Sequence, residues 1–273
     1  MTAAPGSSPS SPVAWRVPLD SLSGDGAVAL ARRGFPATRE LRGQPLDVEA
    51  AMSEPETDDR ALTLFVAPSG AATPFDLLRK LEAFVLADER PGLPRIDMTL
   101  RTRFVACGRR ALAVAPEGAA GEAVEALIHF ALAVDDCQRV RLETEALWGE
   151  LASLVPLTHS VSADDLRRQA AVDAATLRAA AVRMAYLELD RRLSGFDAAM
   201  SPPVRRQWSE LCLQSELLTL LRAHEDMIEM VVETCEAANE RLTEFRYFRS
   251  EWILEVLIVI ALAIDLAAQV FLP

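Results

Sequence analysis

Apolar residues recur at two different spacings along the chain, and the spacing changes near residue 120. Before that point, short apolar or alternating runs are bounded by proline and glycine, a pattern typical of β-strands. They predict strands over residues 61–67, 96–106 and 111–115. The last two are close in sequence, and a chain reversal near Gly108 would join them as a hairpin.

One helix is predicted between the first two of these strands. Thr73 is placed as the N-cap with a proline directly after it, and the amphipathic pattern continues to about Leu86. Helix and strands together predict a small α+β domain over residues 13–118. Residues 1–12 are polar and proline-rich and residues 54–59 are acid-rich, so we interpret them as a disordered tail and a linker.

Helical spacing dominates the second half of the chain. It predicts one helix over residues 120–133 and another over residues 140–155 that ends at Pro156. We expect residues 119–160 to pack on the α+β domain.

Two long helices follow, and each carries a stripe with the 3.5-residue repeat of a coiled coil. The first stripe comprises Leu166, Ala170, Asp173, Leu177, Ala180, Met184, Leu187, Arg191 and Ser194. The second comprises Leu217, Leu221, His224, Ile228, Val231, Cys235, Ala238, Leu242, Phe245, Arg249 and Trp252. A short connection between long helices favours an antiparallel arrangement. The sequence therefore predicts a helical hairpin over residues 161–250, with the two stripes in contact.

The last apolar stretch, residues 252–272, is about 31 Å long as a helix, which matches the roughly 30 Å hydrocarbon core of a bilayer. Residues 251–273 are therefore predicted to form a single C-terminal transmembrane helix. Its anchor residues are Trp252, Ile253, Leu254, Glu255, Ile258, Ile260, Ile264, Asp265 and Gln269. The fold class that results is α+β: a small N-terminal α+β domain, a long antiparallel helical hairpin and one transmembrane helix.

Arginines precede this stretch and none follows it, so the positive-inside rule places the bulk of the chain in the cytoplasm. With no targeting segment at the front, we expect a tail-anchored protein of the bacterial inner membrane, or of the mitochondrial inner membrane in a eukaryote. The alternative is a buried helix in a soluble oligomer. Glu255, Asp265 and Gln269 fall within an arc of about 80° at 100° per residue. We expect that stripe to contact a second copy of the chain or a membrane protein.

Charge and cysteine usage exclude further classes of function. The 40 acidic and 28 basic residues give a formal net charge of -12, which disfavours direct binding of nucleic acid. The four cysteines lie far apart and form no CxxC pair, so neither a zinc site nor a disulfide framework is indicated.

No pattern indicates catalysis. The chain has three histidines and lacks the Walker, GxGxxG, GxSxG and HExxH motifs. We interpret His129 as a buried helix residue. His224, Glu225 and Asp226 resemble a metal cluster, but consecutive residues of a helix point in different directions. The sequence therefore predicts no enzyme, no cofactor and no metal ion.

The end of the chain, RSEWILEVLIVIALAID over residues 249–265, resembles the closing signature of the "required for meiotic nuclear division" or YagE-like family. Glu251 and Trp252 match the family's pre-membrane Glu-Trp, and Asp265 takes the place of its intramembrane acidic residue. Residues 129–133 (HFALA) and 208–221 are similar to two of its helices. The resemblance implies a membrane-anchored, mostly helical, oligomeric protein without known enzymatic activity.

Three functions are compatible with these observations. The first is a non-enzymatic, tail-anchored scaffold or tether, bound to the lipid bilayer and forming a homo-oligomer or contacting a membrane protein. The second is a subunit of an oligomeric transport or channel assembly that uses the polar stripe of the last helix. The third is a soluble enzyme whose site the sequence does not reveal.

Overall fold

The computed structural model describes residues 12–18, 44–53, 61–70, 73–116, 118–194 and 200–271, with side chains of the last helix up to residue 266. The tail over residues 1–11 and the acidic linker over residues 54–59 lie outside this part of the chain. The chain divides into two compact units. Unit 1 comprises Met1–Glu143 and Met184–Glu225, and unit 2 comprises Thr144–Arg183 and Asp226–Pro273.

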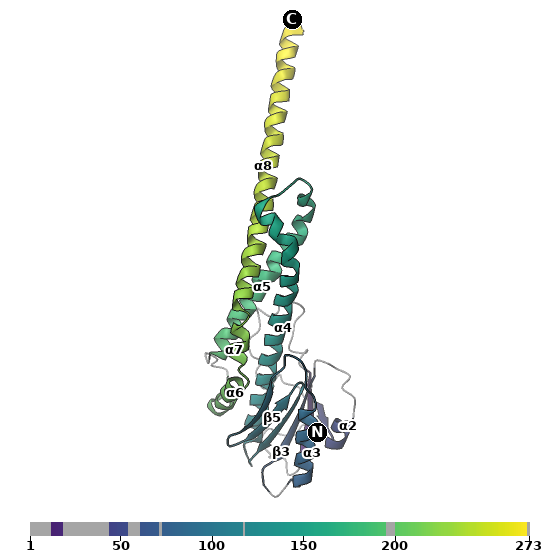
Figure 1. Ribbon diagram of the computed structural model, residues 1–273, viewed down its shortest axis with the longest axis vertical. Helices are drawn as coiled ribbons and strands as arrows, with labels where there is room; N and C mark the ends of the chain where they lie inside the picture. The colour runs from purple at the N-terminus through teal and green to yellow at the C-terminus, as the bar shows by residue number, and fades with distance from the viewer. Residues whose placement is uncertain are drawn as a thin grey trace. The chain divides into compact units, whose positions relative to one another are not determined.

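Unit 1 contains a six-stranded mixed sheet with the order β2-β1-β3-β6-β5-β4 (Figure 1). The strands are β1 (Val13–Pro18), β2 (Gln44–Leu46), β3 (Ala61–Pro68), β4 (Arg95–Thr99), β5 (Arg103–Cys107) and β6 (Arg110–Ala115). The pair β3 and β6 is parallel and the other pairs are antiparallel. The strand predicted over residues 61–67 is confirmed.

Helices cover both faces of this sheet. On one face, Phe65 and Leu112 pack with residues of α2 (Val48–Ser53) and α3 (Phe75–Leu86). On the other face, Leu64 and Phe104 pack with residues of α4 (Ala120–His159) and α6 (Pro202–Gln214). Because β3 is covered on both sides, its residues are apolar in sequence rather than alternating.

The turn at Gly108 is confirmed, and its geometry requires glycine. The backbone there has φ of +59°, and a Cβ would overlap the main-chain oxygen and the carboxylate of Asp88. That carboxylate accepts a hydrogen bond from the Arg109 backbone N–H at 2.6 Å. The single strand predicted over residues 96–106 is wrong, because a tight turn, closed by Leu100 N–H on the carbonyl of Thr102, divides it into β4 and β5.

The helix predicted from Thr73 is confirmed as α3, although Thr73 does not cap it. Its hydroxyl donates to the carbonyl of Pro68 instead, at 3.1 Å. The prediction of two helices over residues 120–155 is wrong, since α4 is one helix of 40 residues. Pro156 lies in its last turn, where the chain continues helical only to His159.

Unit 2 contains antiparallel contacts between α5 (Gln169–Leu193) and α8 (Glu225–Phe271). The Gln169 amide donates to Asn239 Oδ1 at 3.0 Å, and the Thr176 hydroxyl donates to the carbonyl of Cys235 at 3.2 Å. The helix predicted from Leu217 is interrupted after α7 (Leu217–Arg222), before α8 begins.

The stripe predicted for the first long helix is not the face that packs. Leu177, Met184 and Leu187 are exposed. The buried face of α5 is a second stripe with the same repeat, and it comprises Val172, Ala175, Ala179, Val182, Tyr186 and Leu189. The two stripes have the same repeat, so apolar periodicity alone selected the wrong face.

The structure also contradicts the predicted transmembrane helix. In the part of the chain that the structure describes, no helix holds a stretch that is long and apolar enough to cross a membrane. Within α8, Glu255 and Asp265 bound an uninterrupted apolar run of residues 256–264. That run spans about 14 Å, roughly half of a hydrocarbon core. The tail anchor is therefore wrong, and the inner-membrane localisation that depended on it loses its support.

Candidate functional site

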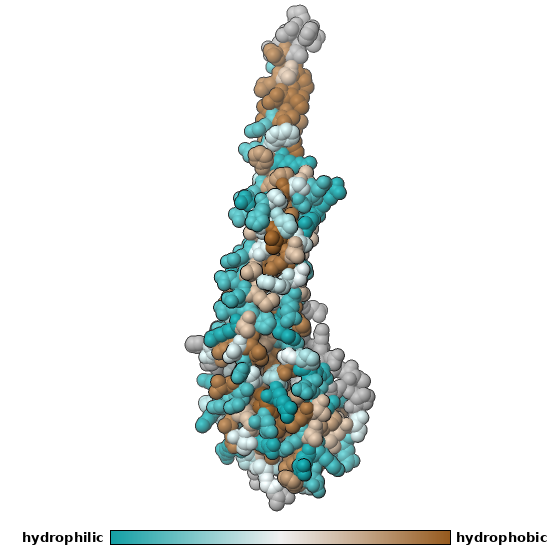
Figure 2. All heavy atoms as spheres, in the orientation of Figure 1, coloured by the Kyte–Doolittle hydropathy of each residue, from teal (hydrophilic) through white to brown (hydrophobic). Residues whose placement is uncertain are grey.

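The C-terminal part of α8, residues 252–266, is a mostly apolar helix that no other described part of the chain covers. No described residue of α8 beyond Leu242 is buried. The large apolar side chains exposed along this segment are Trp252, Ile253, Leu254, Leu257, Ile258, Val259, Ile260, Leu262, Ile264 and Leu266. On the face that Figure 2 shows, hydrophobic residues predominate along this part of α8. Monomeric proteins seldom expose contiguous apolar surface of this extent unless a partner covers it.

The exposed segment continues the repeat of the buried one. The residues Leu217, Leu221, Ile228, Val231, Cys235, Ala238 and Leu242 are buried, and His224 and Phe245 are half-buried. Counting alternately by three and four from Phe245 gives Arg249 and then Trp252, Val256, Val259, Ala263 and Leu266. We call these last five residues the C-terminal seam.

Charged residues lie beside the C-terminal seam and not on it. At 100° per residue the five members of the seam fall within an arc of about 80°. Glu255 is about 60° from its centre and Asp265 about 140°, and both are exposed. The side chain of Gln269 lies outside the described residues. Of the stripe predicted to meet a partner, Glu255 therefore flanks the seam and Asp265 lies on the far side of the helix.

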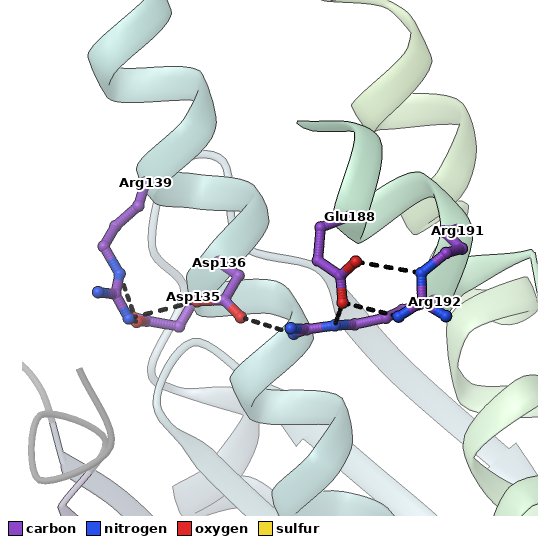
Figure 3. Close-up of polar contacts among 6 residues, drawn as sticks. All are labelled: Asp135, Asp136, Arg139, Glu188, Arg191 and Arg192. Atoms are coloured by element: carbon purple, nitrogen blue, oxygen red, sulfur yellow. Dashed lines mark hydrogen bonds and ion pairs between the residues drawn. The ribbon is translucent and has the colours of Figure 1, made fainter. Parts of the chain in front are cut away.

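A buried ion network joins three elements of unit 1. Asp135 on α4 accepts from Arg109 Nη2 at 2.6 Å and from Arg139 Nη2 at 2.6 Å. Asp136 pairs with Arg192 of α5 at 3.7 Å. Figure 3 shows the two aspartates between the arginines that α4 and α5 supply. The network ties the β5–β6 turn and α5 to α4.

At its other end, the network reaches the exposed surface through Glu188. Its carboxylate accepts from Arg191 Nη2 at 2.8 Å and from Arg192 Nε at 3.0 Å. These two hydrogen bonds hold the pKa of Glu188 below its usual value. Since each of these carboxylates already has a guanidinium partner, the arrangement favours a positioning role over general-base catalysis.

A cavity of about 350 Å³ lies within unit 1 between α4, α7 and the loop before β4. We call it the α4–α7 cavity. Its lining residues are Gly92, Leu93, Pro94, Val134, Cys137, Gln138, Val140, Arg141, Leu217, Leu220, Leu221 and His224. Its volume is at the small end of the range for ligand pockets.

The histidines and cysteines do not assemble into a reactive centre in the described part of the chain. No group of three or more His, Cys, Asp or Glu side chains there has the arrangement of a metal site. His129 is buried on α4, with Nε2 3.9 Å from Glu125 Oε1. Burial raises the pKa of the Cys137, Cys212 and Cys235 thiols, so all three are protonated at neutral pH.

Sequence reasoning missed the ion network and the cavity. The arginines and aspartates of the network are separated by up to 83 positions, from Arg109 to Arg192, and no local pattern links them. One signal was available: Asp135 and Asp136 interrupt an apolar helix that is buried against the sheet. Adjacent carboxylates in such a position require cationic partners.

Comparisons with known proteins assign neither a family nor a function to the chain. No family model matches the chain, and no curated protein matches it. Among solved structures, the chain is similar to the one titled "structure of the full-length CmaX protein", with 13% identity and a TM-score of 0.34. That alignment covers 99% of this chain and 88% of the other. At this level of likeness neither fold nor function transfers, and the resemblance to the YagE-like family stays a prediction.

Proposed function

We propose that the chain is a non-enzymatic scaffold protein that associates with a second copy of itself through the C-terminal seam. The observation that carries this proposal is the heptad repeat of α8, which continues in register from its buried part into its exposed part. Within unit 2 the repeat is covered by α5 up to about Leu242. Beyond Leu242 the same apolar pattern continues, so we expect another helix to pack against it.

The occupant that fits best is the same helix of another copy. A two-fold interface places the same patch of both subunits in contact. An apolar stripe without charged residues, such as the C-terminal seam, is therefore complementary to itself. The seam also extends an interface that already exists within the chain, with side chains of the same kind. Glu255 and Asp265 lie outside the seam and stay in water when two such helices pair.

The energy available is enough for association of moderate affinity. Trp252, Val259 and Leu266 are 58%, 64% and 64% exposed. Complete burial of such side chains contributes about 1.5–3 kcal/mol each, so the exposed parts leave about 1–2 kcal/mol. Two paired helices bury six such side chains, which together contribute about 6–12 kcal/mol. The cost of association is about 4–15 kcal/mol, which predicts a dimer that dissociates on dilution.

Sedimentation of two matched variants tests the proposal. Val259→Asp places a carboxylate in the middle of the seam, whereas Leu254→Asp places one on the far side of the same helix, about 160° from the centre of the seam. Val259→Asp should weaken self-association by about a thousandfold, because each copy loses apolar contact and buries a charge. Leu254→Asp should leave the association constant nearly unchanged. Equal effects of the two variants, or a wild-type chain that is monomeric at all concentrations, would contradict the proposal.

A further inference from the structure

The largest and the smallest side chains of the C-terminal seam are Trp252 and Ala263, which lie near its two ends. Both are exposed, Trp252 to 58%. We propose that two copies of the chain pair through the seam in antiparallel directions, so that Trp252 of each copy packs against Ala263 of the other. This inference rests on the proposed function and adds the direction of the pairing. Each copy then enters the paired segment from the opposite end, an arrangement that suits a tether between two bodies.

Antiparallel pairing matches the seam with itself when its centre falls at residues 257–258. Trp252 is then at the level of Ala263 of the second copy, and Val256 is at the level of Val259. Layers that combine a large with a small side chain fill the space between two helices evenly. Parallel pairing would instead put two tryptophans in one layer and two alanines in another. The first layer would be crowded and the second would leave a gap, and both weaken packing.

Arg249 disfavours the parallel direction. It is exposed and occupies the repeat position before Trp252. In a parallel pair the two Arg249 residues would lie at one level, with their guanidinium groups close together. In the antiparallel pair they are 17 positions apart along the shared axis, or about 26 Å, which is well beyond the Debye length of about 8 Å at physiological salt. Each then lies beside Leu266 of the second copy, and its aliphatic stem covers that side chain while the guanidinium group stays in water.

The two sides of the seam favour the same direction. On one side lie Ile253 and Ile260, about 80–100° from the centre of the seam, and on the other lies Glu255, at about 60°. In an antiparallel pair like sides meet, so Ile253 of each copy lies beside Ile260 of the other. These isoleucines are 44% and 49% exposed, and pairing covers them. In a parallel pair unlike sides meet, and each isoleucine side would face a glutamate.

Engineered cysteines in the full-length chain measure the direction. At a concentration where the wild type sediments as a dimer, copper phenanthroline should link the copies of Ile253→Cys/Ile260→Cys by disulfides, because these positions lie side by side in the antiparallel pair. Ala263→Cys should stay unlinked, since its two copies are about 17 Å apart along the axis and a disulfide spans Cα atoms up to about 7 Å apart. A parallel pair would give the opposite result. The wild-type chain controls for its own four cysteines.

Ala263→Leu gives a second measurement that needs no cysteine. In the antiparallel pair the added bulk meets Trp252 in two layers, so sedimentation should show self-association weakened at least about tenfold. In a parallel pair two leucines would fill the gap between the alanines and strengthen self-association. Ala261→Leu is the matched control, because residue 261 is exposed about 180° from the centre of the seam, and it should leave the association constant unchanged.

These experiments separate this inference from the proposed function. A wild-type chain that is monomeric at all concentrations overturns both. A chain that dimerises while Ala263→Cys is linked, or while Ile253→Cys/Ile260→Cys is not, overturns the antiparallel direction alone. So does a stronger dimer of Ala263→Leu. Linkage of Ile253→Cys by itself would place the copies in another register and also overturn the inference, because the two residues are about 14 Å apart along the axis in the proposed pair.

Discussion

Asparagine in place of Asp135 is the sharpest perturbation of the ion network in unit 1. Asp135 is 8% exposed, and its carboxylate accepts two charge-assisted hydrogen bonds of 2.6 Å, from Arg109 and Arg139. The amide has nearly the same volume, so the change removes charge without opening a cavity. Removal of one partner from a buried ion pair costs about 3–5 kcal/mol. Since Arg139 keeps a contact of 3.4 Å with Asp136, we expect a loss of about 3 kcal/mol.

Hydrogen exchange of the β3 and β6 amides measures this loss locally, because both strands belong to unit 1. The matched control is Glu150→Gln, which breaks the exposed pair of Glu150 with Arg178 in unit 2 and should cost less than about 1 kcal/mol. Exchange of Asp135 for leucine together with Arg109 for methionine should be less damaging than Asp135→Asn alone, since the Arg109 guanidinium is not left without its carboxylate. If Asp135→Asn costs less than about 1 kcal/mol, the network does not hold these elements together.

Three further outcomes follow from the same contacts. The pKa of Glu188 is lowered in the folded state, so its contribution to stability is complete above pH 4.5 and is lost as the pH falls through its folded pKa; the stability difference between wild type and Glu188→Gln should shrink in acid urea titrations. Gly108→Ala should cost at least about 2 kcal/mol in urea unfolding, through its φ of +59° and the overlap with Asp88, and a neutral result would refute the proposed turn. Cys212 and Cys235 should react with a thiol reagent only when the protein unfolds, and rapid labelling of the native chain would contradict their burial.

Local elements could be predicted from the sequence where one physical signal dominated. Residues 61–67 form β3, as expected of a short apolar run that proline and glycine follow. The Gly108 turn follows from the alternation on both sides of it. The strands β1 and β2 gave no such signal, because β1 ends in a proline and β2 has only three residues.

Choices between two similar patterns could not be made from the sequence. In α5, two stripes carry the same repeat, and the spacing of apolar residues does not show which of them is buried. In α4, Pro156 marked a helix end correctly to within one turn, but nothing local showed that residues 120–155 form one helix. In α8, the apolar stretch predicted a membrane span, and Glu255 and Asp265 were given too little weight.

Cross-linking between labelled and unlabelled copies detects whether the C-terminal seam of one copy meets the seam of another. Equal amounts of nitrogen-15-labelled and unlabelled chain, both grown with a photoreactive leucine analogue, are mixed, irradiated and digested. We expect cross-links that join labelled to unlabelled peptides of residues 252–266, through Leu266 above all, and we expect Val259→Asp to abolish them. Cross-links from these residues that stay within one copy, or that persist in the Val259→Asp variant, would contradict this pairing.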